Sequence, residues 1–205
     1  LFRSNGLATL ARIHQIDLDG VDLSRLPRSA EDESPARHEI DKFKAMATPD
    51  VQARTPGVVL EALEYLDTNA PIGGPRRLCW GDARPGNVIW KDLKPAAVID
   101  WEMASLADPL QEVGWWYWID YVNCVGLGAP RPGGLPELAT IYRDWHAITG
   151  LPIDDAAFYD LFTVTRYAII LEKKFIAMEA AGIEGIGNFA VPFVAECLAK
   201  CRVTE

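Results

Sequence analysis

Residues 78–90 of the chain read LCWGDARPGNVIW, and residues 97–102 read AVIDWE. Each stretch contains a short run rich in β-branched and aromatic residues, Val88–Trp90 in the first and Ala97–Ile99 in the second. The segment Asp92–Pro95 between them has the composition of a turn. Together these features predict a small β-hairpin.

Three polar side chains border this hairpin. Asp82 and Asn87 lie on the loop that enters it, and Asp100 lies at its exit, so we expect all three to converge at one end. Phosphoryl transfer uses such a set: one carboxylate accepts the proton of the attacking hydroxyl, while an amide oxygen and a second carboxylate hold magnesium on the nucleotide phosphates. Asp-x-x-x-x-Asn alone is also what an ordinary capped turn contains. Its combination with Ile99-Asp100-Trp101-Glu102 and Asp108-Pro109 favours the catalytic interpretation.

These motifs resemble the catalytic and metal-binding segments of the aminoglycoside phosphotransferase and choline kinase superfamily, which carry His-Gly-Asp-x-x-x-x-Asn and Ile-Asp-Trp/Phe-Glu. The resemblance implies a protein-kinase-like fold, ATP as co-substrate, Mg²⁺ as cofactor and a small-molecule hydroxyl as acceptor. It implies that Asp82 is the catalytic base and that Asn87 and Asp100 are the magnesium ligands. Trp80 stands where the superfamily usually has His, a residue whose role in kinase-like folds is mainly structural.

Five further polar residues are candidates with open alternatives. Arg84, the cation on the loop, either touches phosphate or an anionic substrate or fixes the loop by a hydrogen bond. Glu102 is a candidate partner behind the metal ligands. His14 belongs to a segment that resembles the start of the superfamily's helical lobe, and its apolar helix face favours packing over substrate contact. Arg166 and Glu172 lie near an apolar helix stripe, and they either face a pocket or form an internal ion pair.

The remaining chain predicts an α+β fold that is mostly helical: a protein-kinase-like C-terminal lobe with a small β-hairpin carrying the catalytic and metal-binding loops. Apolar periodicity and capping signals place the helices. We expect the first helix to be capped by Ser4 or Asn5 and to carry Leu7, Leu10, Ala11 and His14 on one face. The others are expected over 35–47, from Thr55 (N-cap, Pro56 at the first position) to 69, from Asp108 (N-cap, Pro109 at the first position) through Trp115–Trp118, and over 138–150, 154–181 and 191–202.

Charge and cysteine usage limit the functional classes. The formal net charge of −9 argues against non-specific binding to nucleic acid or to an anionic membrane. The four cysteines, Cys79, Cys124, Cys197 and Cys201, have no regular framework and indicate buried thiols in a reducing cytosol, hence a cytoplasmic protein. No signal peptide or membrane-length apolar run is present in the sequence.

A kinase-like enzyme also needs a β-rich lobe with a glycine-rich loop and a strand lysine, and residues before Trp80 show neither. We therefore expect residues 1–205 to be the catalytic and substrate lobe without its nucleotide lobe, able to fold but inactive alone. A pseudokinase-like binding or scaffold module is the alternative from another class. Metal-dependent hydrolysis is less well supported, because the three histidines lack ligand spacing.

Overall fold

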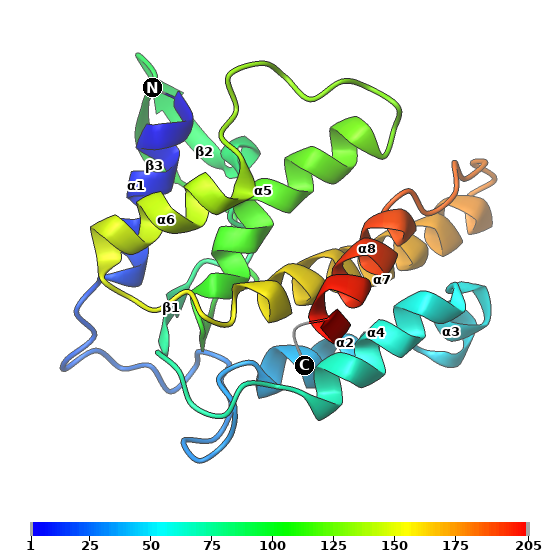
Figure 1. Cartoon of the computed structure of the whole chain (residues 1–205), viewed down its shortest axis with the longest axis horizontal. Helices are drawn as coiled ribbons and strands as arrows, with labels where there is room; N and C mark the ends of the chain where they lie inside the picture. The colour runs from blue at the N-terminus through cyan, green and yellow to red at the C-terminus, as the bar shows by residue number, and fades with distance from the viewer. Residues whose placement is uncertain (1, 204–205) are drawn as a thin grey trace.

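The computed structural model describes residues 2–203 and, from Ser4 onward, their side chains. The described chain is mostly helical, with two small pairs of antiparallel strands (Figure 1). In chain order its elements are α1 (Phe2–His14), α2 (Arg37–Met46), α3 (Pro49–Arg54), α4 (Gly57–Thr68), β1 (Arg77–Cys79), the 3₁₀ turn η1 (Pro85–Asn87), β2 (Val88–Lys91), β3 (Lys94–Val98), β4 (Ser105–Ala107), α5 (Leu110–Val125), α6 (Leu138–Thr149), α7 (Ala156–Ala180) and α8 (Val191–Val203).

The long helix α7 is the centre of the helical core. Helices α2, α3, α4, α5 and α8 all pack against it, as its yellow-to-orange ribbon in Figure 1 shows for α8. Its predicted apolar positions, including Phe162 and Ile169, are buried. Because α5 packs on both α6 and α7, it joins this core to a second group made of α1, α6 and the β-strands. The run Trp115–Trp118 is buried on every side of α5, as an all-round apolar helix requires.

The predicted hairpin is present as β2 and β3, with Val88 paired to Val98. The turn is tighter than predicted, because it consists of Asp92 and Leu93 alone, both with positive φ (50° and 61°). Two-residue turns of this hand match the twist of the flanking strands. Pro95, which the sequence placed in the turn, lies in β3 beside a register irregularity, where a proline is tolerated.

Several helix starts differ from the sequence-based expectation. Ser4 and Asn5 lie inside α1 and do not cap it, and the Asn5 amide instead donates to the Leu93 carbonyl oxygen (2.9 Å). Pro56 and Pro109 immediately precede α4 and α5 and are not their first residues. Asp108 still serves the start of α5, because its Oδ1 accepts from the Leu110 N–H (2.9 Å).

Three short elements were not predicted at all. Helix α3 has six residues, and strands β1 and β4 have three residues each, pairing Cys79 with Ser105. Elements this short carry too few residues for a periodic signal.

The cysteines and the helices agree with two of the compositional expectations. All four cysteines are free thiols, and Cys79, Cys197 and Cys201 are buried as expected, whereas Cys124 is only half-buried. Within residues 2–203, no helix combines the length and the apolar character needed to cross a bilayer.

Candidate active site

The carboxylate of Asp82 is fixed by three N–H donors. Its Oδ2 accepts from Arg84 Nε (2.8 Å) and from Asn87 Nδ2 (2.7 Å), and its Oδ1 accepts from the indole Nε1 of Trp115 (2.8 Å). Three bonds from three directions leave this carboxylate one orientation. Of the alternatives for Arg84, the structure contains the loop-fixing hydrogen bond.

Asn87 connects the catalytic loop to the exit of the hairpin. Its amide nitrogen also donates to the Asp82 carbonyl oxygen (3.1 Å), and its own backbone carbonyl accepts from the Ile99 N–H (3.0 Å). The second bond continues the β2–β3 pairing and brings the residue after Ile99, Asp100, alongside the loop. Among the described residues, the amide oxygen of Asn87 has no hydrogen-bond donor.

Asp100 has unusual backbone geometry for a residue other than glycine, with φ of 65°. Asp tolerates this left-handed region better than most residues, and such strain concentrates at functional sites. The residue is exposed, and within residues 2–203 its carboxylate has no hydrogen bond or ion pair. Glu102 is likewise exposed and has no bonded partner in that range, so the structure does not bring it into contact with Asp82 or Asn87.

Trp80 performs a structural task at the position where the superfamily has His. Its indole Nε1 donates to two carbonyl oxygens, those of Ile99 (2.8 Å) and Asp100 (3.0 Å). These bonds connect the backbone at Ile99 and Asp100 to the catalytic loop. Trp80 is almost fully buried, so the connection lies inside the fold.

Gly81 allows a close approach that no other residue permits. It has φ of 99°, and a β-carbon at this position would overlap the Met103 carbonyl group. The loop therefore needs glycine both for its backbone conformation and for its contact with the segment after Asp100.

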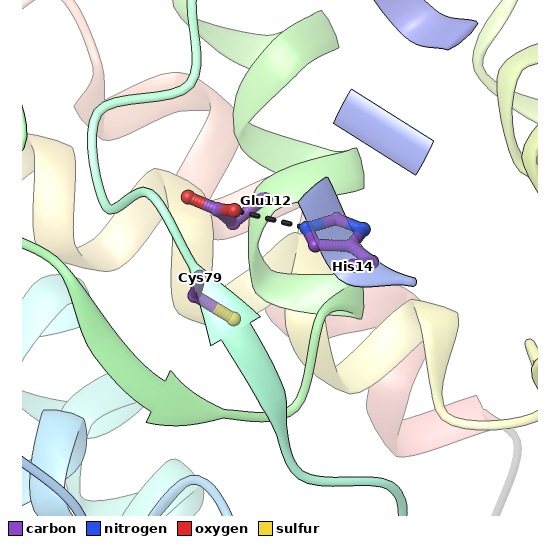
Figure 2. A group of neighbouring side chains, drawn as sticks. All are labelled: His14, Cys79 and Glu112. Atoms are coloured by element: carbon purple, nitrogen blue, oxygen red, sulfur yellow. Dashed lines mark hydrogen bonds and ion pairs between the residues drawn. The ribbon is translucent and has the colours of Figure 1, made fainter. Parts of the chain in front are cut away.

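A buried carboxylate, Glu112 of α5, supports the loop and also faces His14 of α1 (Figure 2). Its oxygens accept from the backbone N–H groups of Trp80 (2.8 Å) and Gly81, and from His14 Nε2 (2.9 Å). The other ring nitrogen of His14, Nδ1, accepts from Trp145 Nε1 (3.0 Å), so the neutral ring must carry its proton on Nε2. His14 is fully buried, which confirms the packing interpretation and adds a hydrogen-bonding role.

His14, Cys79 and Glu112 also form a group whose ligand atoms lie within 4.8 Å of one another. Both ring nitrogens of His14 and both oxygens of Glu112 are engaged in the hydrogen bonds above, and the Cys79 thiol donates to the Ala107 carbonyl oxygen (3.6 Å). Burial raises the pKa of the Cys79 thiol well above its ordinary value, which disfavours the thiolate that metals bind. This group is a hydrogen-bonded support, and a metal ion would have to replace its bonds.

Arg166 of α7 supports the other side of the loop. Its guanidinium donates to the Gly81 carbonyl oxygen (3.2 Å) and lies over the Trp115 ring, 3.6 Å from the centroid. Burial lowers the pKa of Arg166 to about 10. The ion pair considered between Arg166 and Glu172 is not formed, because Glu172 accepts instead from Arg54 Nε (3.1 Å).

A pocket of about 450 Å³ opens beside Asp82. Its walls come from the catalytic loop, α5 and α7, and include Arg84, Trp115, Ile119, Tyr167 and Lys174. The sequence did not reveal the roles of Glu112, Trp115 and Arg166. Glu112 lies in the DPLQE segment that begins at Asp108. Its position close to the Asp108-Pro109 motif was the one feature of the sequence that could have indicated its role.

A sequence profile of the phosphotransferase enzyme family (APH) matches residues 7–149, more than half of the chain. The chain belongs to this family. The resemblance inferred from its motifs is therefore confirmed. One curated relative is mouse acyl-CoA dehydrogenase family member 10, which is 25% identical over 182 residues, or 80% of this chain and 16% of that protein.

Solved structures share the fold at low sequence identity. A putative aminoglycoside phosphotransferase of Ralstonia eutropha superposes with a TM-score of 0.72 at 17% identity, covering 96% of this chain and 61% of its own. The choline kinase LicA of Streptococcus pneumoniae gives 0.57 at 19% identity, with 96% and 62% covered. LicA in complex with AMP gives 0.52 at 18% identity, with 94% and 59% covered. The predicted fold class, a kinase-like lobe that is mostly helical with a small hairpin, is confirmed, and the chain spans about three fifths of these structures.

Proposed function

We propose that this chain is the catalytic lobe of an ATP-dependent phosphotransferase that transfers the γ-phosphate to the hydroxyl of a small molecule. One observation carries the proposal. The Asp82 carboxylate is held by three N–H donors, one of them the Asn87 amide, and the Asn87 amide oxygen and the Asp100 carboxylate lack donors among the described residues. Family membership supports the same reaction class.

In the proposed reaction, Asp82 orients the acceptor hydroxyl and takes its proton as the oxygen attacks the γ-phosphorus. The bonds from Asn87 and Trp115 fix the carboxylate before any ligand binds, and such preorganisation is most of what phosphoryl transfer requires from a protein. Arg84 holds Asp82, and its guanidinium would lie beside a phosphate group positioned for attack at Asp82.

The oxygen atoms around Asp82 fit magnesium. Mg²⁺ prefers carboxylate and amide oxygens, and Asn87 and Asp100 offer one of each on adjacent backbone segments. When bound, the ion would neutralise charge on the nucleotide phosphates. The remaining ligands would be phosphate oxygens and water, because Mg²⁺ rarely relies on protein groups alone.

The nucleotide lobe is part of this proposal. A glycine-rich loop and a strand lysine position the γ-phosphate in kinase-like enzymes. We propose that these parts lie outside residues 1–205, and that these residues alone fold, bind magnesium weakly and show no turnover. Turnover by residues 1–205 comparable to that of a complete kinase would contradict this.

The test compares Asp82→Asn with Asp92→Asn in the protein expressed from its complete gene. The second variant makes the same chemical change in the turn of the same hairpin, where Asn also tolerates positive φ. We expect Asp82→Asn to lower turnover about 10²- to 10⁴-fold with the fold intact, and Asp92→Asn to leave it unchanged. Full activity of Asp82→Asn would overturn the assignment. Nucleotide binding without turnover in the unaltered protein would instead support a pseudokinase-like scaffold.

A further inference from the structure

The pocket beside Asp82 is positively charged in a negatively charged chain. The formal net charge is −9, yet within the described residues the charged side chains lining this pocket are two cations, Arg84 and Lys174, and one carboxylate, Asp82. Arg84 and Asp82 are bonded to each other and compensate each other. Lys174 therefore leaves the pocket with an uncompensated positive charge.

Lys174 lies on the face of α7 that lines the pocket. Tyr167, Ile170, Leu171 and Lys174 all belong to the lining, and their i, i+3, i+4, i+7 spacing places them on one side of the helix. With a rise of about 1.5 Å per residue, Lys174 lies about 10 Å along the axis from Tyr167. The Lys174 ammonium has no hydrogen bond or ion pair within residues 2–203, so it is available to a ligand.

The aromatic rings of the pocket are not arranged to bind a cation. One face of Trp115 is already covered by the Arg166 guanidinium, 3.6 Å from the ring centroid. Tyr167 packs edge-on against Trp115, with centroids 5.8 Å apart, and its hydroxyl donates to Asn123 Oδ1 (2.9 Å). A cationic acceptor would meet two pocket cations and no carboxylate other than the one that takes the proton.

We propose that the acceptor is an alcohol with an apolar body and an anionic group, an inference that rests on the function proposed for Asp82. The hydroxyl lies at Asp82, the apolar body lies along Ile170 and Leu171, and the anionic group pairs with Lys174. The hydroxyl oxygen forms a bond to the γ-phosphorus, and the bond from that phosphorus to the β–γ bridging oxygen breaks, its electron pair remaining on ADP. The hydroxyl proton moves to an Asp82 carboxylate oxygen. The product is a phosphate monoester that keeps its original anionic group.

Binding is measured first, because it does not depend on turnover. The indole N–H signal of Trp115 in the ¹⁵N-labelled full-length protein, identified by its loss in Trp115→Phe, reports on the pocket next to Asp82. The probes are an ω-hydroxy carboxylate, its methyl ester and the amino alcohol of equal length. We expect the carboxylate to bind about tenfold more tightly than the ester, and the amino alcohol most weakly. Equal affinity for the three compounds would overturn the inference.

Three variants locate the anion site. Lys174→Gln should lower carboxylate affinity about tenfold and leave ester affinity unchanged, and Lys174→Glu should reverse the preference towards the amino alcohol. Lys173→Gln removes an exposed lysine that does not line the pocket and should change neither affinity. In turnover, Lys174→Gln should raise the KM of the carboxylate and leave kcat and the KM of ATP unchanged. An effect on the KM of ATP alone, or an equal effect of Lys173→Gln, would contradict the assignment.

The two proposals fail in different ways. Phosphorylation of neutral or cationic alcohols without selectivity for the carboxylate would overturn the acceptor class and leave the phosphotransferase function standing. Selective carboxylate binding through Lys174 without phosphorylation of any probe would overturn the proposed function and leave the anion site standing.

Discussion

The two sides of the catalytic loop differ in how they are held. Beneath the loop, Glu112, His14 and Arg166 are buried, and they hydrogen-bond to its backbone or to one another. On the side of the hairpin exit, Asp100 and Glu102 are exposed, and their carboxylates have no hydrogen bond or ion pair within residues 2–203. The difference indicates that the fold fixes the loop before a ligand arrives and leaves the exposed oxygen atoms for ligands.

This division has a physical reason. Buried hydrogen bonds in a low-dielectric interior are strong when every group is paired and costly when one partner is lost. A loop anchored in this way can present Asp82 in one geometry without reorganisation during the reaction. Breaking the buried side should therefore affect stability, and changing the exposed side should not.

The largest expected effect comes from Glu112→Gln. The change removes the carboxylate that accepts from Trp80 N, Gly81 N and His14 Nε2, and leaves donors unpaired inside the fold. We expect a loss of about 3 kcal/mol in the free energy of unfolding, measured by chemical denaturation. Glu102→Gln makes the same substitution on the exposed side and should change stability by less than about 0.5 kcal/mol. Equal effects of the two variants would contradict the comparison.

A second effect concerns the pH dependence of the buried side. Burial raises the pKa of Asp108 to about 7 from its ordinary value of 3.8. Between these two pKa values the folded state holds a proton that the unfolded state releases, so the contribution of Asp108 to stability is fully present below about pH 4 and is lost as the pH rises through 7. Asp108→Asn should make the unfolding free energy less dependent on pH, gaining on the order of 2 kcal/mol over wild type between pH 5 and pH 7. Parallel pH profiles for the two proteins would refute this.

A smaller effect is expected where the two sides meet, at Trp80. Trp80→Phe keeps most of the buried ring but removes the N–H that donates to the Ile99 and Asp100 carbonyl oxygens. We expect a loss of about 1 kcal/mol, because two acceptors lose one donor. Trp101→Phe is the matched control, since the half-exposed Trp101 donates only to the Val98 carbonyl oxygen (3.1 Å). If Trp101→Phe destabilised the protein more than Trp80→Phe, the tie assigned to Trp80 would be wrong.

No effect is expected from metal chelation on the buried group of His14, Cys79 and Glu112. Its side chains are already hydrogen-bonded to one another, to the loop backbone, to Trp145 and to the Ala107 carbonyl oxygen, so neither EDTA nor added Zn²⁺ should change the Tm of the ligand-free protein. A metal bound to the folded state would raise the Tm by mass action. A fall in Tm with EDTA would show that the group holds a metal.

The sequence predicted the exposed side better than the buried side. The contact of Asp82 with Asn87 and the hairpin that brings Asp100 near them depend on residues close in the chain, whose spacing is visible in the motif. His14 meets Glu112 across 98 residues and Trp145 across 131, and no local pattern specifies such contacts.

Helix positions could be predicted because helix starts and stops depend on local sequence, whereas contacts between helices depend on residues far apart in the chain. Gly150, expected to end α6, adopts φ of 68° at its C-terminus, because local chemistry alone determines that stop. Arg166 was recognised as unusual within its apolar stripe, but its partners, Gly81 and Trp115, depend on how α5 and α7 pack.

The most direct test of the central claim is a crystal structure of the full-length protein with Mg²⁺ and a non-hydrolysable ATP analogue. The account predicts a magnesium ion bonded to Asn87 Oδ1 and to an Asp100 carboxylate oxygen at about 2.1 Å, with the hydrogen bonds beneath the loop unchanged. It also predicts that the Asp82 carboxylate faces the pocket on the side of the γ-phosphate. A magnesium ion bound elsewhere, with Asn87 and Asp100 in contact with neither metal nor phosphate, would contradict it.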